Sequence, residues 1–126
     1  MNLLLDTSAV IAGELALDPG DTTAISVVTI GELRAGTLLA AEPSTRAARQ
    51  ARLSAVREAY EPLPVDEAVA ERYGEVLAQA RSARRITNAT DLLIIATAAS
   101  TGRRLCTLDD RQARLAQEIG LEIAPL

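Results

Sequence analysis

The stretch that decides the fold is NLLLD, residues 2–6, followed at once by TSAVIAGELA, residues 7–16. A short, continuous apolar run is typical of a strand that is buried on both faces, as in a parallel sheet. The residues after it have helical spacing, and Thr7 or Ser8 can cap that helix. The two segments therefore predict a strand followed by a helix, which is the first unit of an α/β fold.

The same alternation of short apolar runs and helical segments continues along the chain. We expect further strands at 23–26, around Leu63 and Val65, at 104–108 and at 121–125, and helices at 27–41, 44–60, 67–85, 88–100 and 110–120. Strands that alternate with helices form βαβ units, and hence a parallel sheet with helices on both faces. Residues 1–126 contain no repeat, low-complexity segment or linker, so we expect a single domain.

The composition narrows the chemistry. Of the 126 residues 48% are apolar, one is cysteine and none is histidine, while the 13 basic residues are all arginine. Catalytic systems that depend on imidazole cannot be built, and a Walker-type phosphate loop lacks its lysine. The single thiol of Cys106 cannot form an internal disulfide. The 17 acidic residues remain as the main candidates for catalysis, and carboxylates are suited to Mg²⁺ or Mn²⁺.

The N-terminal segment MNLLLDTSAVIAG has no basic leader, and Asp6 interrupts its apolar run. It therefore resembles neither a signal peptide nor a membrane span. We expect a soluble, cytoplasmic protein without membrane association.

Two acids follow predicted strands, Asp6 after LLL and Asp109 after LCTL. In an open parallel sheet the functional crevice lies at the carboxyl ends of the strands, where the strand order reverses. Asp91, in the first turn of the apolar helix at 88–100, can face the same edge, and Glu32 in the helix VVTIGELRAG is a fourth candidate. If the strands that carry them are neighbours, the carboxylates converge.

Each of these acids also has a purely structural explanation. Asp6 and Asp109 could cap the helices that follow them, and Asp110 competes with Asp109 for the same position. Asp91 stands three positions after a cap residue, as in a capping box. Glu32 could be an ordinary solvated acid on a helix. The residues alone leave these alternatives open.

Four segments in order, LLLDTSAVI, SVVTIGELRAG, NATDLLIIATA and LCTLDDR, resemble those of PIN-domain ribonucleases, and among them the VapC-type toxins of bacterial toxin–antitoxin pairs. The resemblance runs from Asn2 to the last predicted strand. It implies a three-layer α/β/α sandwich with a central parallel sheet and an acidic metal pocket. It also implies four catalytic residues, Asp6, Glu32, Asp91 and Asp109, of which Asp6, Asp91 and Asp109 hold the metal.

Neighbouring polar residues also match the family. Thr7 or Ser8 and Thr107 fall on hydroxyl positions that commonly orient these carboxylates. The chain departs from the family at Gln112, where an aromatic residue is often found.

The activity that the resemblance implies is Mg²⁺-dependent hydrolysis of RNA, with Mn²⁺ able to replace Mg²⁺. The metal would activate a water molecule, and Glu32 would orient or deprotonate it; one or two ions could take part. In-line attack would leave a 5′-phosphate and a 3′-hydroxyl. The implied partners are an RNA substrate, an antitoxin protein whose tail covers the active site, and a second copy of the chain in a homodimer.

The net charge of −4 is unusual for a protein that binds RNA, so we expect arginines to supply local positive surface. The candidates are Arg34, Arg81, Arg84, Arg85, Arg103 and Arg104, with a solvated charged face as the alternative. Two tyrosines are the only aromatic residues, so base stacking is not expected to dominate recognition.

Residues 37–60 mix leucine and valine with arginine, and the residues concerned are Leu38, Leu39, Leu53, Val56, Arg46, Arg49, Arg52 and Arg57. This pattern suits an amphipathic helix pair that presents a groove to a partner, and it suits ordinary core packing equally well.

Two other functions compete with the ribonuclease. A degenerate domain that binds RNA or protein without metal predicts no stabilisation by divalent cations. A nuclease of the same fold that cuts DNA is not separated from one that cuts RNA by any residue in the chain.

Overall fold

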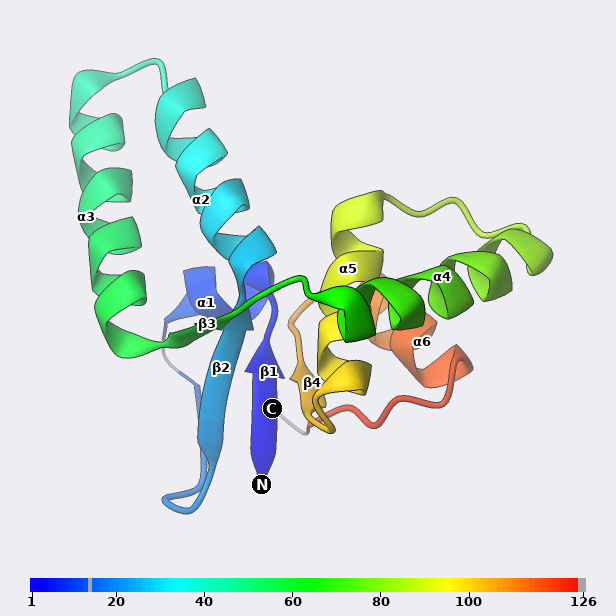
Figure 1. The fold of residues 1–126 in the computed structure, drawn as a ribbon. Helices are drawn as coiled ribbons and strands as arrows, with labels where there is room; N and C mark the ends of the chain where they lie inside the picture. The colour runs from blue at the N-terminus through cyan, green and yellow to red at the C-terminus, as the bar shows by residue number, and fades with distance from the viewer. Residues whose placement is uncertain (14, 125–126) are drawn as a thin grey trace.

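A parallel sheet of four strands forms the centre of the computed structural model, which describes residues 1–13 and 15–124 (Figure 1). The strands are β1 (Asn2–Leu5), β2 (Thr22–Ser26), β3 (Glu61–Leu63) and β4 (Arg104–Cys106), and their order is β3-β2-β1-β4. Leu5 of the central strand pairs with Ile25 on one side and with Cys106 on the other, both in parallel register. The predicted parallel sheet is therefore confirmed.

Six helices connect and cover the strands. They are α1 (Thr7–Ala12), α2 (Val27–Leu39), α3 (Pro43–Ala59), α4 (Glu67–Ser82), α5 (Ala89–Ser100) and α6 (Asp110–Glu118). Most of the expected boundaries agree to within a few residues. The first helix is shorter than expected because Gly13 takes a φ of 77°, a left-handed conformation that ends a helix, and residue 14 lies outside the described residues.

The last expected strand, 121–125, is present only as an isolated bridge. Ile123 pairs with Leu105, and the Ala124 N–H donates to the Leu105 carbonyl at 2.9 Å. Residue 125 lies outside the described part of the chain.

Two separate cores cover the two faces of the sheet, because successive residues of a strand point to opposite sides. One core joins Leu4, Ala24 and Leu105 to apolar residues of α4, α5 and α6. The other joins Leu3, Leu5, Ile25 and Cys106 to apolar residues of α1, α2 and α3. Each fully buried leucine contributes roughly 1.5–3 kcal/mol to stability. The three-layer α/β/α sandwich is confirmed.

The order of the strands fixes where a site can form. The chain lays β2 and β3 on one side of β1 and then returns to place β4 on the other side, so the strand order reverses between β1 and β4 (Figure 1). The carboxyl ends of these two strands meet at one edge, where an open parallel sheet forms its crevice. Asp6 follows β1 at that edge, and Thr107 follows β4.

Helices α2 and α3 lie side by side as a hairpin that extends away from the sheet (Figure 1). Leu38 and Leu39, near its tip, are 58% and 82% exposed. No helix within residues 1–13 and 15–124 combines the length and the apolar character needed to cross a bilayer.

Candidate active site

Asp6 is held at the end of β1 by three donors. Its carboxylate accepts hydrogen bonds from Ser8 Oγ at 2.6 Å, from the Ala9 N–H at 3.0 Å and from Thr107 Oγ1. Asp6 is the N-cap of α1 and is only 5% exposed. A carboxylate offers about four lone pairs, so capping leaves capacity for one further partner. The structural and the functional explanations of Asp6 are therefore compatible.

Thr107 links the ends of β1 and β4. Its hydroxyl donates to Asp6 and accepts from the Asp109 N–H at 3.0 Å. Ser8 Oγ, which also donates to Asp6, accepts from the Leu108 N–H at 3.0 Å. These hydroxyls thus orient Asp6 and fix the loop that carries Asp109.

Glu32 is tied to the start of α1 from the neighbouring helix α2. Its Oε1 accepts a hydrogen bond from Thr7 Oγ1 at 2.7 Å, and Thr7 Oγ1 lies 3.2 Å from the hydroxyl of the buried Thr29. Glu32 is half-buried. It is therefore not a freely solvated acid, because a residue next to Asp6 holds it in place.

Asp91 stands in the first turn of α5, whose cap Asn88 accepts the Asp91 N–H at 2.9 Å. Burial raises the pKa of its carboxyl, and the negative charges of Glu32, Asp109 and, more weakly, Asp6 raise it further, while a hydrogen bond from Asn88 opposes the shift. The charges of Glu32, Asp109 and Asp6 therefore all act on Asp91, which places these acids around the start of α5. Asp91 and Asp109 line one cleft, whereas Glu32 lines a neighbouring cavity.

Asp109 rather than Asp110 faces this site. Asp109 caps α6 by accepting the N–H groups of Arg111 at 2.9 Å and Gln112 at 3.4 Å. It lines a cleft of about 770 Å³ together with Asp91, and its charge acts on Asp91. Asp110 does neither.

Gln112, at a position where the resembled family often has an aromatic residue, contacts the backbone of Asp91. It is 4% exposed, and its Nε2 donates to the backbone carbonyl of Asp91 at 3.1 Å. This bond ties the start of α6 to the start of α5. Its spacing from Leu115 and Ala116 places Gln112 on the buried face of α6, and this spacing could have identified it.

The predicted arginines lie in different parts of the molecule. Arg84 and Arg85 line the cleft beside Asp91, whereas Arg81 does not, and Arg34 on α2 donates instead to Gln50 at 2.8 Å. Two arginines that the sequence analysis did not select, Arg111 and Arg114, line the cleft as well.

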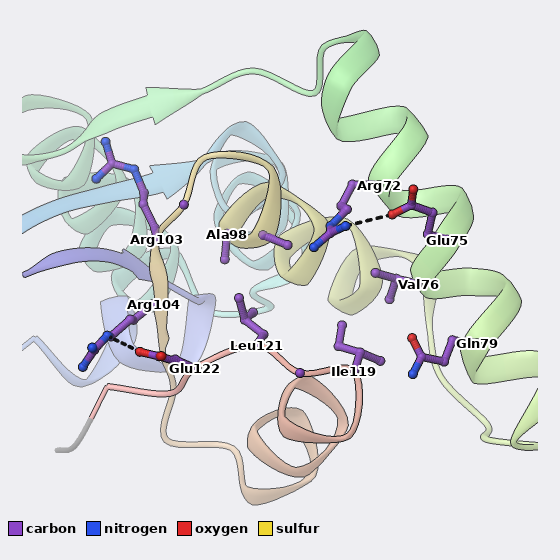
Figure 2. A pocket seen from close by; sticks show the side chains of 13 residues that line it. Arg72, Glu75, Val76, Gln79, Ala98, Arg103, Arg104, Ile119, Leu121 and Glu122 are labelled. Atoms are coloured by element: carbon purple, nitrogen blue, oxygen red, sulfur yellow. Dashed lines mark hydrogen bonds and ion pairs between the residues drawn. The ribbon is translucent and has the colours of Figure 1, made fainter.

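Arg103 and Arg104 line a different pocket of about 490 Å³, at the start of β4 (Figure 2). None of the four predicted acids lines this pocket. At its rim Arg104 pairs with Glu122 at 2.7 Å and Arg72 pairs with Glu75 at 3.0 Å. The positive charges of these two pairs are therefore already compensated.

The ligand atoms available at the acidic site suit a hard divalent cation. They are oxygen atoms of carboxylates, and a cation would relieve the repulsion that, after burial, raises the pKa of Asp91. Within residues 1–13 and 15–124, no three histidine, cysteine or acidic side chains are arranged to hold one ion together. Mg²⁺ is commonly bound through one or two carboxylates and keeps several waters. The three-residue ligand set remains a prediction.

Comparison with known proteins agrees with this architecture. The PIN domain family model matches residues 3–118. Ribonuclease VapC4 of Mycobacterium tuberculosis is 37% identical over 117 residues, covering 89% of each chain. Ribonuclease VapC5 of the same organism is 41% identical over 127 residues, covering 95% of this chain and 92% of the relative. This chain belongs to the PIN-domain family.

A solved structure supports the same assignment. The crystal structure of VapBC-5 from M. tuberculosis, a member of the VapBC family of toxin–antitoxin systems, matches with a TM-score of 0.86 at 37% identity. The match covers 99% of this chain and 98% of that one. The resemblance found in the sequence, including the VapC-type relatives, is thus confirmed.

Proposed function

We propose that this protein is a Mg²⁺-dependent endoribonuclease and the toxin of a toxin–antitoxin pair, with Mn²⁺ able to replace Mg²⁺. The observation that carries the proposal is that the charges of Glu32, Asp109 and Asp6 all act on Asp91 near the strand-order reversal, in a chain without histidine or lysine. The names of the VapC ribonucleases support it.

Asp6, Asp91 and Asp109 would hold the cation. Asp6 retains a lone pair after its three hydrogen bonds, and Asp109 uses only Oδ1 for its cap. When bound, the ion supplies polarisation of the phosphodiester and a lower pKa for the attacking water.

Glu32 is suited to handle the proton. Thr7 occupies Oε1 and fixes the orientation of the carboxylate, which leaves Oε2 to accept a hydrogen bond from the attacking water and then its proton. In-line attack on the scissile phosphorus leaves a 5′-phosphate and a 3′-hydroxyl. All four acids are present, which argues against a degenerate module.

The α2–α3 hairpin is our proposed docking site for an antitoxin. A cavity of about 350 Å³ connects Glu32 and the exposed Ile11 with Arg49 and Arg52 of α3. A segment seated there would cover the active site. Leu53 and Val56, by contrast, are core residues, so the core-packing explanation holds for them.

The metal requirement is tested by thermal unfolding with EDTA, Mg²⁺ or Mn²⁺. A cation at 100 times its Kd stabilises the fold by about 2.7 kcal/mol, which corresponds to roughly 10 °C in Tm. We expect Asp91→Asn to remove most of this shift and Asp110→Asn to retain it. If the metal-dependent rise in Tm is unchanged in Asp91→Asn, Asp91 does not bind the cation and has only a structural role at the start of α5.

Cleavage is tested with purified protein on RNA and on DNA of the same sequence. We expect cut RNA with 5′-phosphate ends, no cutting in EDTA and none by Asp91→Asn. Cleavage that persists in EDTA excludes the proposed chemistry, and cutting of DNA alone changes the substrate class.

We also propose that the chain forms a homodimer and binds its antitoxin as a protein complex. Light scattering on the purified protein should give twice the 13.3 kDa of one chain. A monomer at every concentration tested contradicts the dimer. Co-expression with the cognate antitoxin should suppress RNA cleavage, and suppression should weaken in Ile11→Glu.

A further inference from the structure

We propose that a cleft beside the acidic site binds the phosphate backbone of a single RNA strand and leads it to the carboxylates. This inference rests on the proposed ribonuclease function. The cleft has a volume of about 770 Å³ and shares Asp91 and Asp109 with the active site. We call it the basic cleft, after the four arginines that line it, Arg84, Arg85, Arg111 and Arg114.

Three of these arginines have uncompensated charge. Arg85 pairs with Glu118 at 2.7 Å, whereas Arg84, Arg111 and Arg114 form no ion pair with a carboxylate within residues 1–13 and 15–124. Arg114 Nε donates to the backbone carbonyl of Asp110 at 3.3 Å. The cleft is therefore positive beside a negative site, although the net charge of the chain is −4.

Arg84 occupies a backbone position where glycine is usual. It has a φ of 55° and is the one residue other than glycine with a positive φ in the described part of the chain. Its N–H donates to Arg81 O at 3.0 Å, and the Arg85 N–H donates to Ala80 O at 2.9 Å, which is the Schellman pattern at the end of α4. A side chain is strained in this conformation. Arg81, in the last turn of α4, already complements the helix dipole, so the dipole does not require a second arginine at position 84. A role of the Arg84 side chain in binding is the better explanation for arginine in place of glycine.

The chemistry of the lining selects phosphate rather than bases. Guanidinium groups bind phosphate oxygens in a bidentate manner, and no aromatic side chain lines the cleft to stack on a base. Ile86, also in the lining, is 92% exposed and offers only an apolar contact. A strand held by its phosphates at Arg111 and Arg114 reaches Asp109 within the same cleft. The expected binding is strong in low salt and weakly dependent on sequence.

The pocket in Figure 2 provides the contrast. It is lined by three arginines, of which Arg72 and Arg104 are paired with glutamates, while Arg103 forms no ion pair within residues 1–13 and 15–124. The pocket contains none of the four active-site acids. Arg72→Ala changes the net charge as much as any substitution in the basic cleft, and it is therefore the matched control.

The test measures fluorescence anisotropy of a labelled single-stranded RNA of about 12 nucleotides. Titrations in EDTA at several salt concentrations separate binding from cleavage. We expect Arg84→Gly, Arg111→Ala and Arg114→Ala each to weaken binding about threefold to tenfold, and to reduce the slope of log K against log salt by about 0.7. Arg72→Ala should bind as the wild type does. Arg84→Gly should keep or raise the Tm, because glycine adopts a positive φ without strain.

If RNA binding is unchanged in the three cleft variants, or is reduced equally in Arg72→Ala, the proposal that the basic cleft binds RNA is wrong. Cleavage of the same RNA in Mg²⁺ is followed in parallel. A wild type that binds through the cleft without cutting RNA refutes the proposed function and leaves the cleft intact. A wild type that cuts RNA, with cleft variants that bind and cut equally well, refutes the cleft alone.

Discussion

Replacing Thr107 by valine should destabilise the protein more than any other change of one hydroxyl to a methyl group. The Thr107 hydroxyl donates to the buried carboxylate of Asp6 and accepts the Asp109 N–H at 3.0 Å. A hydrogen bond to a charged group contributes about 1.5–3 kcal/mol. The amide left without its partner is partly buried and adds up to about 1 kcal/mol. The total of about 1.5–4 kcal/mol corresponds to a fall in Tm of roughly 5–15 °C for a domain of this size.

The matched control is Thr97→Val in α5. Thr97 is fully buried, and its hydroxyl donates to the Leu93 carbonyl at 2.8 Å, within its own helix. Valine has the same shape and leaves no charged group without a donor, so the change should stay within about 0.5 kcal/mol. Denaturant unfolding of both variants in EDTA measures the difference. Equal losses in the two variants would refute the role of Thr107 as the link between Asp6 and the Asp109 loop.

Four other outcomes can be checked. The raised pKa of Asp91 means that the metal-free fold loses stability as pH rises through that pKa. In EDTA, Asp91→Asn should therefore melt above the wild type near pH 7, and the two should converge towards about pH 4. Asp109→Asn should lower RNA cleavage at least tenfold while Asp110→Asn leaves it unchanged, and the reverse result would exchange their roles. Burial raises the pKa of the Cys106 thiol to about 11, so a thiol reagent at pH 8 should label Cys106 only after unfolding. Gln112→Leu should weaken Mn²⁺ binding, measured by calorimetry, more than it lowers the Tm, because the bond to Asp91 positions a ligand; an unchanged Mn²⁺ affinity would make Gln112 purely structural.

Much of the fold could be predicted from the sequence because its signals are local. The apolar run 2–5 and the polar caps Ser26 and Asp66 act within a few residues, and each cap accepts a backbone N–H in its own helix. Of the last expected strand, the described residues 121–124 form only a parallel bridge from Ile123 to Leu105 at the sheet edge. Whether this segment pairs as a strand depends on its distant partner Leu105 and not only on the residues of the segment itself.

For the site, the sequence by itself determined which side chains are available: carboxylates and arginines, with no histidine or lysine. It also placed Asp6 and Asp109 after strands. Only the tertiary structure decided that β4 lies beside β1, which lets Thr107 reach Asp6 across 101 positions of the chain and brings the charge of Glu32 to bear on Asp91.

The tertiary structure also determines that Asp109, and not Asp110, lines the cleft. It likewise determines which arginines form ion pairs, as Arg85 does with Glu118. The physical reason is that hydrogen bonds and charge interactions depend on distances of a few ångströms between side chains. Local sequence sets the conformation of each segment, whereas those distances follow from how the strands are ordered and how the helices pack on them.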